Sequence, residues 1–239
     1  MATMTLDDLV TQLRAAYGAR LDSVVLYGSA ATGEHIPKRS DYNVLLLLKE
    51  IDASALASAS AVARAWSDAG NPPPMTMTVD EWRGSADVFP MEYADILERH
   101  RVLYGTPPFD GITVSKDDLR LQLEHQAMGK LLQLRQGALV AGTDGKRQAE
   151  LMAASLSTMM VLFRAVLRLA GEKADLDNAA LAQRVGSMAG FDAAPFVRAV
   201  QHVRGERKLD AGDAGAVLAG YIAGIERLQR YLDRYGASA

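Results

Sequence analysis

The sequence predicts an α+β domain built on a mixed sheet with flanking helices, followed by an all-α helical bundle. Two short, continuously apolar runs in the first half, residues 24–26 and 44–48, are typical of strands that are covered on both faces. From about residue 115 onward, apolar residues recur every three to four positions over long stretches. We therefore expect one domain at residues 1–111 and a helical bundle at residues 112–239.

The first domain is expected to begin with a helix. Thr5 and Asp8 form a capping-box pattern, and the apolar residues that follow repeat at helical spacing as far as Gly18. An Ala-rich helix is expected later, and it ends at a run of three prolines because proline cannot continue a helix. The remaining elements are strands or strand-like segments, expected at residues 22–27, 44–48, 75–79, 89–96 and 102–105.

The second half is expected to hold four or five helices. Ser115 and Asp118 form another capping pair, which begins a helix of several turns. A helix is expected at residues 147–170, one on either side of Gly190, and a last one at residues 211–235. Elements of this length and periodicity pack as a bundle.

Composition narrows the classes of function. A hydrophobic fraction of 49% with 23% charged residues is ordinary for a globular protein. No apolar run approaches the ~18 residues of a membrane span, and the start resembles no secretory signal, so a cytoplasmic protein without a membrane partner is expected. The net charge of −3 argues against a general nucleic-acid-binding surface. Oligomeric state is left open, and a homodimer is compatible with the sequence.

The chain has no cysteine, which excludes thiolate zinc sites and cysteine nucleophiles. The four histidines fall in separate segments, and none forms a close pair at the spacing of a helical zinc site. Any bound metal is therefore expected to use oxygen ligands.

Two short motifs carry the chemistry. The first strand ends at Gly28-Ser29, where free backbone N–H groups and a hydroxyl can hold a phosphate. Ser40-Asp41-Tyr42-Asn43 leads directly into the second strand. Residues 41 and 43 project from the same face of a strand, so their side-chain oxygens can converge on a divalent cation.

Together these motifs resemble the Gly-Ser and Asp-x-Asp motifs of the DNA polymerase beta-like nucleotidyltransferase superfamily. The resemblance covers about residues 20–105 and implies a nucleotidyltransferase fold, with Mg2+ or Mn2+ as cofactor and a nucleoside triphosphate as substrate. It implies that Gly28, Ser29 and Ser40 bind the nucleotide, and that Asp41 and Asn43 hold the metal. The helical half would be similar to the bundle of aminoglycoside nucleotidyltransferases, which contributes to the acceptor site.

A third carboxylate is implied by the same resemblance. The segment Pro90-Met91-Glu92-Tyr93-Ala94-Asp95 is similar to the family segment that supplies it, and Glu92 takes the matching position as general base or metal ligand. Asp95 is interpreted as a helix cap or salt-bridge partner.

Asn43 departs from the family pattern, which has a second aspartate there. An amide oxygen can coordinate a cation but brings no charge, and a loss of ~3 to 4 kcal/mol would slow chemistry by about two to three decades. The sequence thus leaves two functions open. One is nucleotidyl transfer to an unidentified small-molecule or protein hydroxyl; the other is a nucleotide-binding pseudoenzyme or antitoxin-type regulatory module. Arg198 and His202 fit poorly the Arg and His spacing of the ribonuclease domains that accompany minimal nucleotidyltransferases.

Overall fold

The computed structural model describes residues 4–31 and 42–235, except for the side chain of Ser29. Within it the chain divides into two compact units, Met1–Ser115 and Lys116–Ala239. Ile112 and Val114 pack against the core of the first unit, so that unit extends past Gly111.

The first unit is organised around a mixed sheet, as the sequence predicts, and the sheet has four strands in the order β3-β2-β1-β4. The central strand β1 is antiparallel to both β2 and β4, whereas β2 and β3 run parallel. The strands are β1 (Leu21–Tyr27), β2 (Asn43–Leu48), β3 (Met75–Thr78) and β4 (His100–Gly105).

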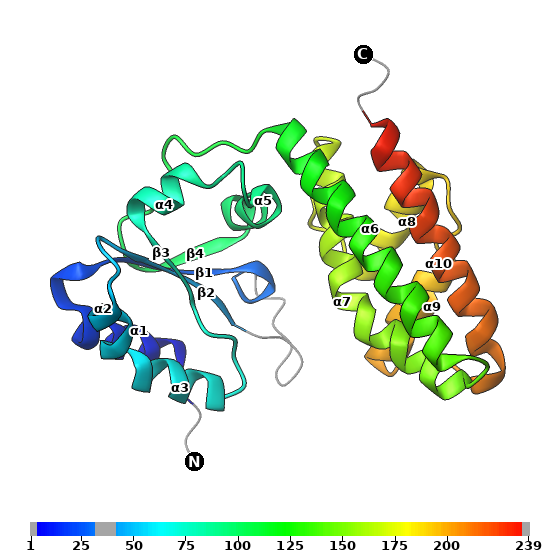
Figure 1. Ribbon diagram of the computed structural model, residues 1–239, viewed down its shortest axis with the longest axis horizontal. Coiled ribbons are helices and arrows are strands. Elements are labelled where there is room, and N and C mark those ends of the chain that lie inside the picture. Colours follow the sequence, from blue (N-terminus) through cyan, green and yellow to red (C-terminus); the bar gives the residue numbers. More distant parts are fainter. Residues whose placement is uncertain (1–3, 32–41, 236–239) are drawn as a thin grey trace. The chain divides into compact units, whose positions relative to one another are not determined.

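Helices cover both faces of this sheet (Figure 1). Alternate residues of β1 and β2 enter two separate cores, which explains why both strands read as continuous apolar runs. One core includes α1 (Leu6–Tyr17), α2 (Ala53–Ser58) and α3 (Ser60–Asp68). The other includes α4 (Val79–Gly84) and α5 (Pro90–Glu98).

Local sequence signals explain where several of these helices begin. The capping box of Thr5 and Asp8 is present at the start of α1, with the Asp8 N–H donating to Thr5 Oγ1 at 3.1 Å. Thr78 and Glu81 form the same motif at α4. Short turns, η1 (Gly18–Arg20) and η2 (Gly28–Ala30), precede and follow β1.

The strand predicted at residues 89–96 is wrong, because this segment forms α5. Pro90 occupies the first turn, where its missing N–H costs nothing and its fixed φ favours a helix. Tyr93 and Ile96 are buried in the core that contains the sheet residues, and Met91 is also buried. The strand that closes the sheet, β4, begins only at His100.

The second unit is a bundle of five helices, as predicted: α6 (Lys116–Ala141), α7 (Gly145–Leu169), α8 (Asn178–Ala189), α9 (Ala194–Arg204) and α10 (Ala211–Arg234). An aromatic cluster joins α7, α9 and α10, in which Phe196 lies with its ring centroid 5.1 Å from Phe163 and 4.3 Å from Tyr221. These rings are fully buried, so they form the centre of the bundle core.

Helix α7 corrects one expectation, because it is long and apolar enough to span a membrane by length and composition. Half of its most apolar window is nevertheless buried within the protein. It contacts all four other helices of the unit through residues such as Met159, Phe163 and Leu167. Its apolar character is therefore that of a bundle-core helix.

Candidate active site

The end of β1 brings together residues from three elements. Strand β1 ends at Tyr27, and the chain turns at Gly28 with a φ of 76°. A Cβ atom at Gly28 would lie 3.4 Å from Asn43 Nδ2 and 3.7 Å from Asp95 Oδ2. The side chains of Asn43 and Asp95 therefore converge on this glycine, which is the residue type best suited to its backbone conformation.

Strand pairing fixes these positions. Tyr27 lies opposite Asn43 of β2 and opposite His100 of β4. The Gly28 N–H donates to the carbonyl of Arg99 at 2.9 Å, which ties the turn to the start of β4. The predicted glycine turn and the predicted Asn43 thus lie side by side at one end of the sheet.

Asn43 is the first residue of β2 and is partly buried. Because side chains alternate along a strand, it shares a face with Leu45 and Leu47. Those two leucines pack in the core that contains Tyr93 and Ile96 of α5. Asn43 therefore points to the face of the sheet that α5 covers.

Helix α5 carries three acidic residues at intervals of about one turn, of which Glu98 is exposed and the other two are Glu92 and Asp95. Both are partly buried, and both make further interactions within the chain. The carboxylate of Asp95 is the one whose oxygen approaches Gly28. Glu92 was expected on a strand of the sheet, whereas it lies on the helix that packs over the sheet.

Tyr27 reports the electrostatics of this region. Burial, followed by the negative charges of Asp95 and Glu92, raises the pKa of Tyr27 to about 12. Both carboxylates thus act on the same ring at the end of β1. Their combined charge is suited to a cationic ligand, and among the residues that the structure describes no basic group contributes to the Tyr27 pKa.

The sequence interpretation did not place Asp95 in the candidate site. Its role was hidden because residues 89–96 were interpreted as a strand, on which positions 92 and 95 point to opposite faces. Pro90 followed by Met91, Glu92 and Ala94 is also typical of a helix start. On a helix, positions three apart share a face, so a helical interpretation would have paired Asp95 with Glu92.

Other predicted site residues cannot be placed in the same way. Ser40 and Asp41 lie outside the described residues, as does the side chain of Ser29. Within residues 4–31 and 42–235 no group of three His, Asp or Glu side chains has the arrangement of a metal site. Asp41, which the family resemblance assigns to the metal, lies outside these ranges.

The overall architecture resembles a solved structure. Spectinomycin adenyltransferase AAD(9) from Enterococcus faecialis, solved with ATP and spectinomycin, matches with a TM-score of 0.60 over 96% of this chain and 100% of that chain. The sequences are 10% identical, so the likeness shows a shared fold. The chain therefore has the nucleotidyltransferase fold that its motifs imply.

A second solved structure, a toxin-antitoxin with AMP-PNP, is 17% identical and covers 57% of this chain and 96% of that chain. Its TM-score of 0.30 is too low to support an argument. No protein family model matches the sequence, and no curated protein matches it.

Proposed function

We propose that the first unit binds a nucleoside triphosphate with a divalent cation and transfers the nucleotidyl group to a hydroxyl of a small-molecule or protein acceptor. The observation that carries this proposal is the convergence of Asn43 and Asp95 on Gly28, at the end of the strand that the Gly-Ser motif terminates. The shared fold with an adenyltransferase that was solved with ATP supports it.

The donors present suit a hard cation. The Asn43 amide, whose nitrogen is its atom nearest to Gly28, also carries an oxygen, and the Asp95 carboxylate approaches the same glycine. Amide and carboxylate oxygens are donors that Mg2+ and Mn2+ bind. Asn43 and Asp95 would hold such an ion together with Asp41. When bound, the ion would neutralise triphosphate charge and increase the acidity of the acceptor hydroxyl.

Residues of the chain itself would position the phosphates and accept the proton. Gly28 and Ser29 would position the phosphates, because the glycine turn lets the backbone approach them closely. The acceptor oxygen would then form a bond to the α-phosphorus, and pyrophosphate would leave with the electron pair of the broken bond. Glu92 would accept the proton of the attacking hydroxyl, since it shares with Asp95 the face of α5 that reaches the end of β1.

A second candidate function, nucleotide binding without transfer, is favoured by one observation. Asn43 supplies no negative charge at the position where the family pattern has an aspartate, so the site holds a cation less strongly. The two functions share a binding site and differ in whether pyrophosphate is released.

Substitution Asn43→Asp tests the proposal. It is nearly isosteric and adds the missing ligand charge, so we expect Mn2+ and Mg2+ to bind more than about tenfold tighter in the presence of nucleoside triphosphate. Gln12→Glu is the matched control, because Gln12 is exposed on α1, which packs on the opposite face of the sheet. Metal affinity is measured by calorimetry, with and without triphosphate.

Three results would separate the candidates. Pyrophosphate release with a panel of hydroxyl acceptors, including spectinomycin, identifies transfer. Cation-dependent triphosphate binding with no release in either wild type or Asn43→Asp identifies the binding protein. If Asn43→Asp binds metal no more tightly than Gln12→Glu, residue 43 does not face the cation and the proposed metal site is wrong.

A further inference from the structure

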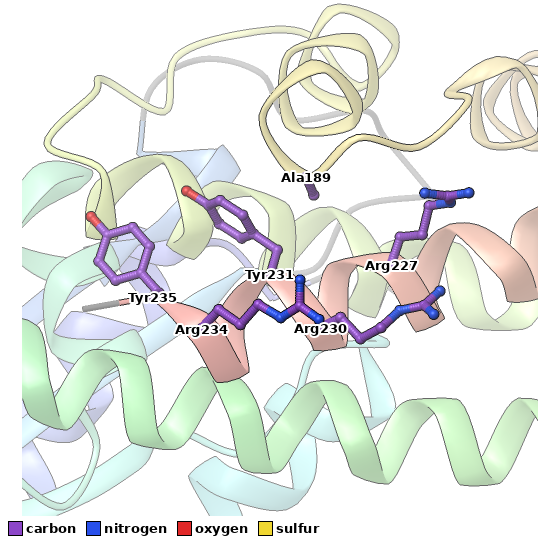
Figure 2. Close-up of a pocket in the computed structure, with 6 residues that line it drawn as sticks. All are labelled: Ala189, Arg227, Arg230, Tyr231, Arg234 and Tyr235. Carbon is purple, nitrogen blue, oxygen red and sulfur yellow. The ribbon is translucent and has the colours of Figure 1, made fainter. Parts of the chain in front are cut away.

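Three arginines line a hollow in the second unit that the proposed function does not use. The hollow has a volume of about 600 Å3 and lies between the last turns of α10 and the end of α8. Figure 2 shows its lining residues, with Ala189 of α8 facing the side chains of α10. Arg227, Arg230, Tyr231 and Arg234 belong to α10, and Tyr235 follows directly after its last residue.

Their spacing places the four α10 residues on one face. At 3.6 residues per turn they span about 100° of the helix circumference. Arg227 and Arg234 are seven residues apart, which corresponds to about 10 Å along the helix axis. Glu226 and Asp233, the acidic residues in this part of α10, fall outside that arc.

The three guanidinium groups are unneutralised. Within residues 4–31 and 42–235, Arg227, Arg230 and Arg234 form no ion pair and no side-chain hydrogen bond. Some exposed arginines of the same unit are paired, as in Arg135 with Glu226 and Arg184 with Glu172. Arg227, Arg230 and Arg234 instead bring three cations without an acidic partner among the described residues together within about two turns of one helix.

The helix dipole explains the position of only one of the three arginines. Arg234 lies in the last turn of α10, where a cation interacts favourably with the helix dipole. Arg227 and Arg230 lie before that turn and gain little from the dipole, since the effect falls off within one turn. Their positions beside Arg234 bring like charges together instead.

Two tyrosines give the hollow an ordered wall. The Tyr235 hydroxyl donates to the carbonyl of Leu169 at 2.9 Å, which ties the end of α10 to α7. The Tyr231 and Tyr235 rings meet edge to face with their centroids 5.7 Å apart. The charges of Glu172 and Arg184 also act on Tyr231. These two residues form an ion pair with no net charge, so the pair does not offset the charges of Arg227, Arg230 and Arg234.

We infer that this pocket binds an oligophosphate, either the phosphate chain of a nucleotide or an inorganic oligophosphate. Guanidinium groups match phosphate oxygens with planar, two-pronged hydrogen bonds. Three of them along about 10 Å match several linked phosphates better than a single one. The hollow is of the size of ordinary small-ligand pockets. The inference is independent of the proposed function, because it uses different residues of a different unit.

Calorimetry with inorganic tripolyphosphate tests this inference. The full chain is titrated at physiological salt with EDTA, since the proposed first-unit site needs a divalent cation and the arginine pocket does not. We expect micromolar to submillimolar binding by wild type, at one site per chain. The double variant Arg227→Gln/Arg230→Gln should bind at least about a hundredfold more weakly, at roughly tenfold per lost charged contact.

Arg207→Gln/Lys208→Gln is the matched control. These two basic residues are exposed between α9 and α10, so the control has the same net charge but keeps the pocket. It should bind tripolyphosphate as wild type does. If both double variants lose tripolyphosphate affinity equally, the loss is explained by net charge and the inference is wrong. Absence of tripolyphosphate binding by wild type would also overturn the inference. Both variants alter exposed side chains, and circular dichroism verifies their folding.

ATP and orthophosphate identify the ligand. Tighter binding of ATP than of tripolyphosphate assigns the pocket to a nucleotide, whereas equal or weaker binding assigns it to an inorganic chain. Orthophosphate binding as tight as that of tripolyphosphate would overturn the assignment to linked phosphates. Repeating the titration with Gly28→Asp, which alters the proposed first-unit site, should leave tripolyphosphate binding unchanged even where the proposed function fails.

Discussion

At the level of single residues, the candidate site depends on a few side chains at the end of β1. The sequence singles out Gly28 and Asn43, and the structure places them side by side because β1 and β2 pair antiparallel. Asp95 could not be predicted in the same way. It follows Asn43 by 52 positions, and its approach depends on how α5 packs over the sheet.

Gly28 is expected to be sensitive to substitution. Its φ of 76° is strained for a residue with a side chain, so Gly28→Ala should lower the free energy of unfolding by about 1 to 2 kcal/mol. Urea denaturation followed by tryptophan fluorescence measures this. Gly84→Ala is the control, because Gly84 ends α4 with open space around its Cα and has no positive φ. A loss at Gly84 equal to that at Gly28 would contradict the role of backbone strain.

Tyr27 should lose its hydroxyl proton at a higher pH than an exposed tyrosine does. Burial and the charges of Asp95 and Glu92 raise its pKa to about 12, and Asp95→Asn should lower that pKa by removing one of the two charges. Because the folded pKa lies above the unfolded value near 10, the contribution of Tyr27 to stability is present below pH 10 and is lost as pH rises toward 12. Absorbance at alkaline pH follows all eight tyrosines, and the difference between the titration curves of wild type and Asp95→Asn reports the shift of Tyr27.

Glu98→Gln is the control for this titration. It removes the same charge from α5, yet Glu98 is not among the groups that shift the pKa of Tyr27. An unchanged titration in Asp95→Asn would show that the Asp95 carboxylate does not face the ring.

At the level of elements, the strands were easier to predict than α5. Continuous apolar runs such as residues 44–48 have one physical explanation, burial on both faces of a sheet, and that explanation holds. The segment 89–98 is short and only partly apolar, so its periodicity does not separate helix from strand. The helix forms because its buried residues reach the core beside Trp82, which the local sequence does not reveal.

The helical form of α5 leads to a prediction about its two carboxylates. Asp95→Asn should weaken the joint binding of Mn2+ and nucleoside triphosphate about tenfold or more, because its oxygen approaches Gly28 and Asn43. Glu92→Gln should weaken this joint binding less than Asp95→Asn does. If Glu92 accepts the proton, Glu92→Gln should nevertheless reduce any pyrophosphate release at least as strongly as Asp95→Asn. Calorimetry and a pyrophosphate assay measure the two effects. Equal changes in both properties for both variants would refute this division of roles.

At the level of the whole molecule, the two halves of the sequence carry different periodicities because they bury their apolar residues differently. Strands that are covered by helices on both faces need continuous apolar runs, whereas each bundle helix needs one apolar face. The order of α and β segments therefore predicted the fold, although the likeness to a solved adenyltransferase is at 10% identity. The arginine hollow was not predictable, since solvent-facing charges on a helix are ordinary until their partners are known.

Separate cores predict that the two units unfold independently. Both tryptophans of the chain, Trp66 and Trp82, are buried in the first unit, so tryptophan emission reports that unit, whereas far-ultraviolet circular dichroism reports mainly the helices of the second. Leu46 is 2% exposed between the sheet and its helices, and Leu46→Asp would bury a charge at a cost of several kcal/mol. We expect this variant to lose native tryptophan emission while it keeps most of its helical signal.

The reciprocal variant makes the test symmetrical. Leu228 is fully buried in α10, so Leu228→Asp should abolish most of the helical signal and leave native tryptophan emission in place. Leu139→Asp serves as control, because Leu139 is 84% exposed on α6 and its substitution should change neither signal. If Leu46→Asp also removes the helical signal, the bundle depends on the first unit for its stability, because an independent bundle would keep its own buried core of Phe163, Phe196 and Tyr221.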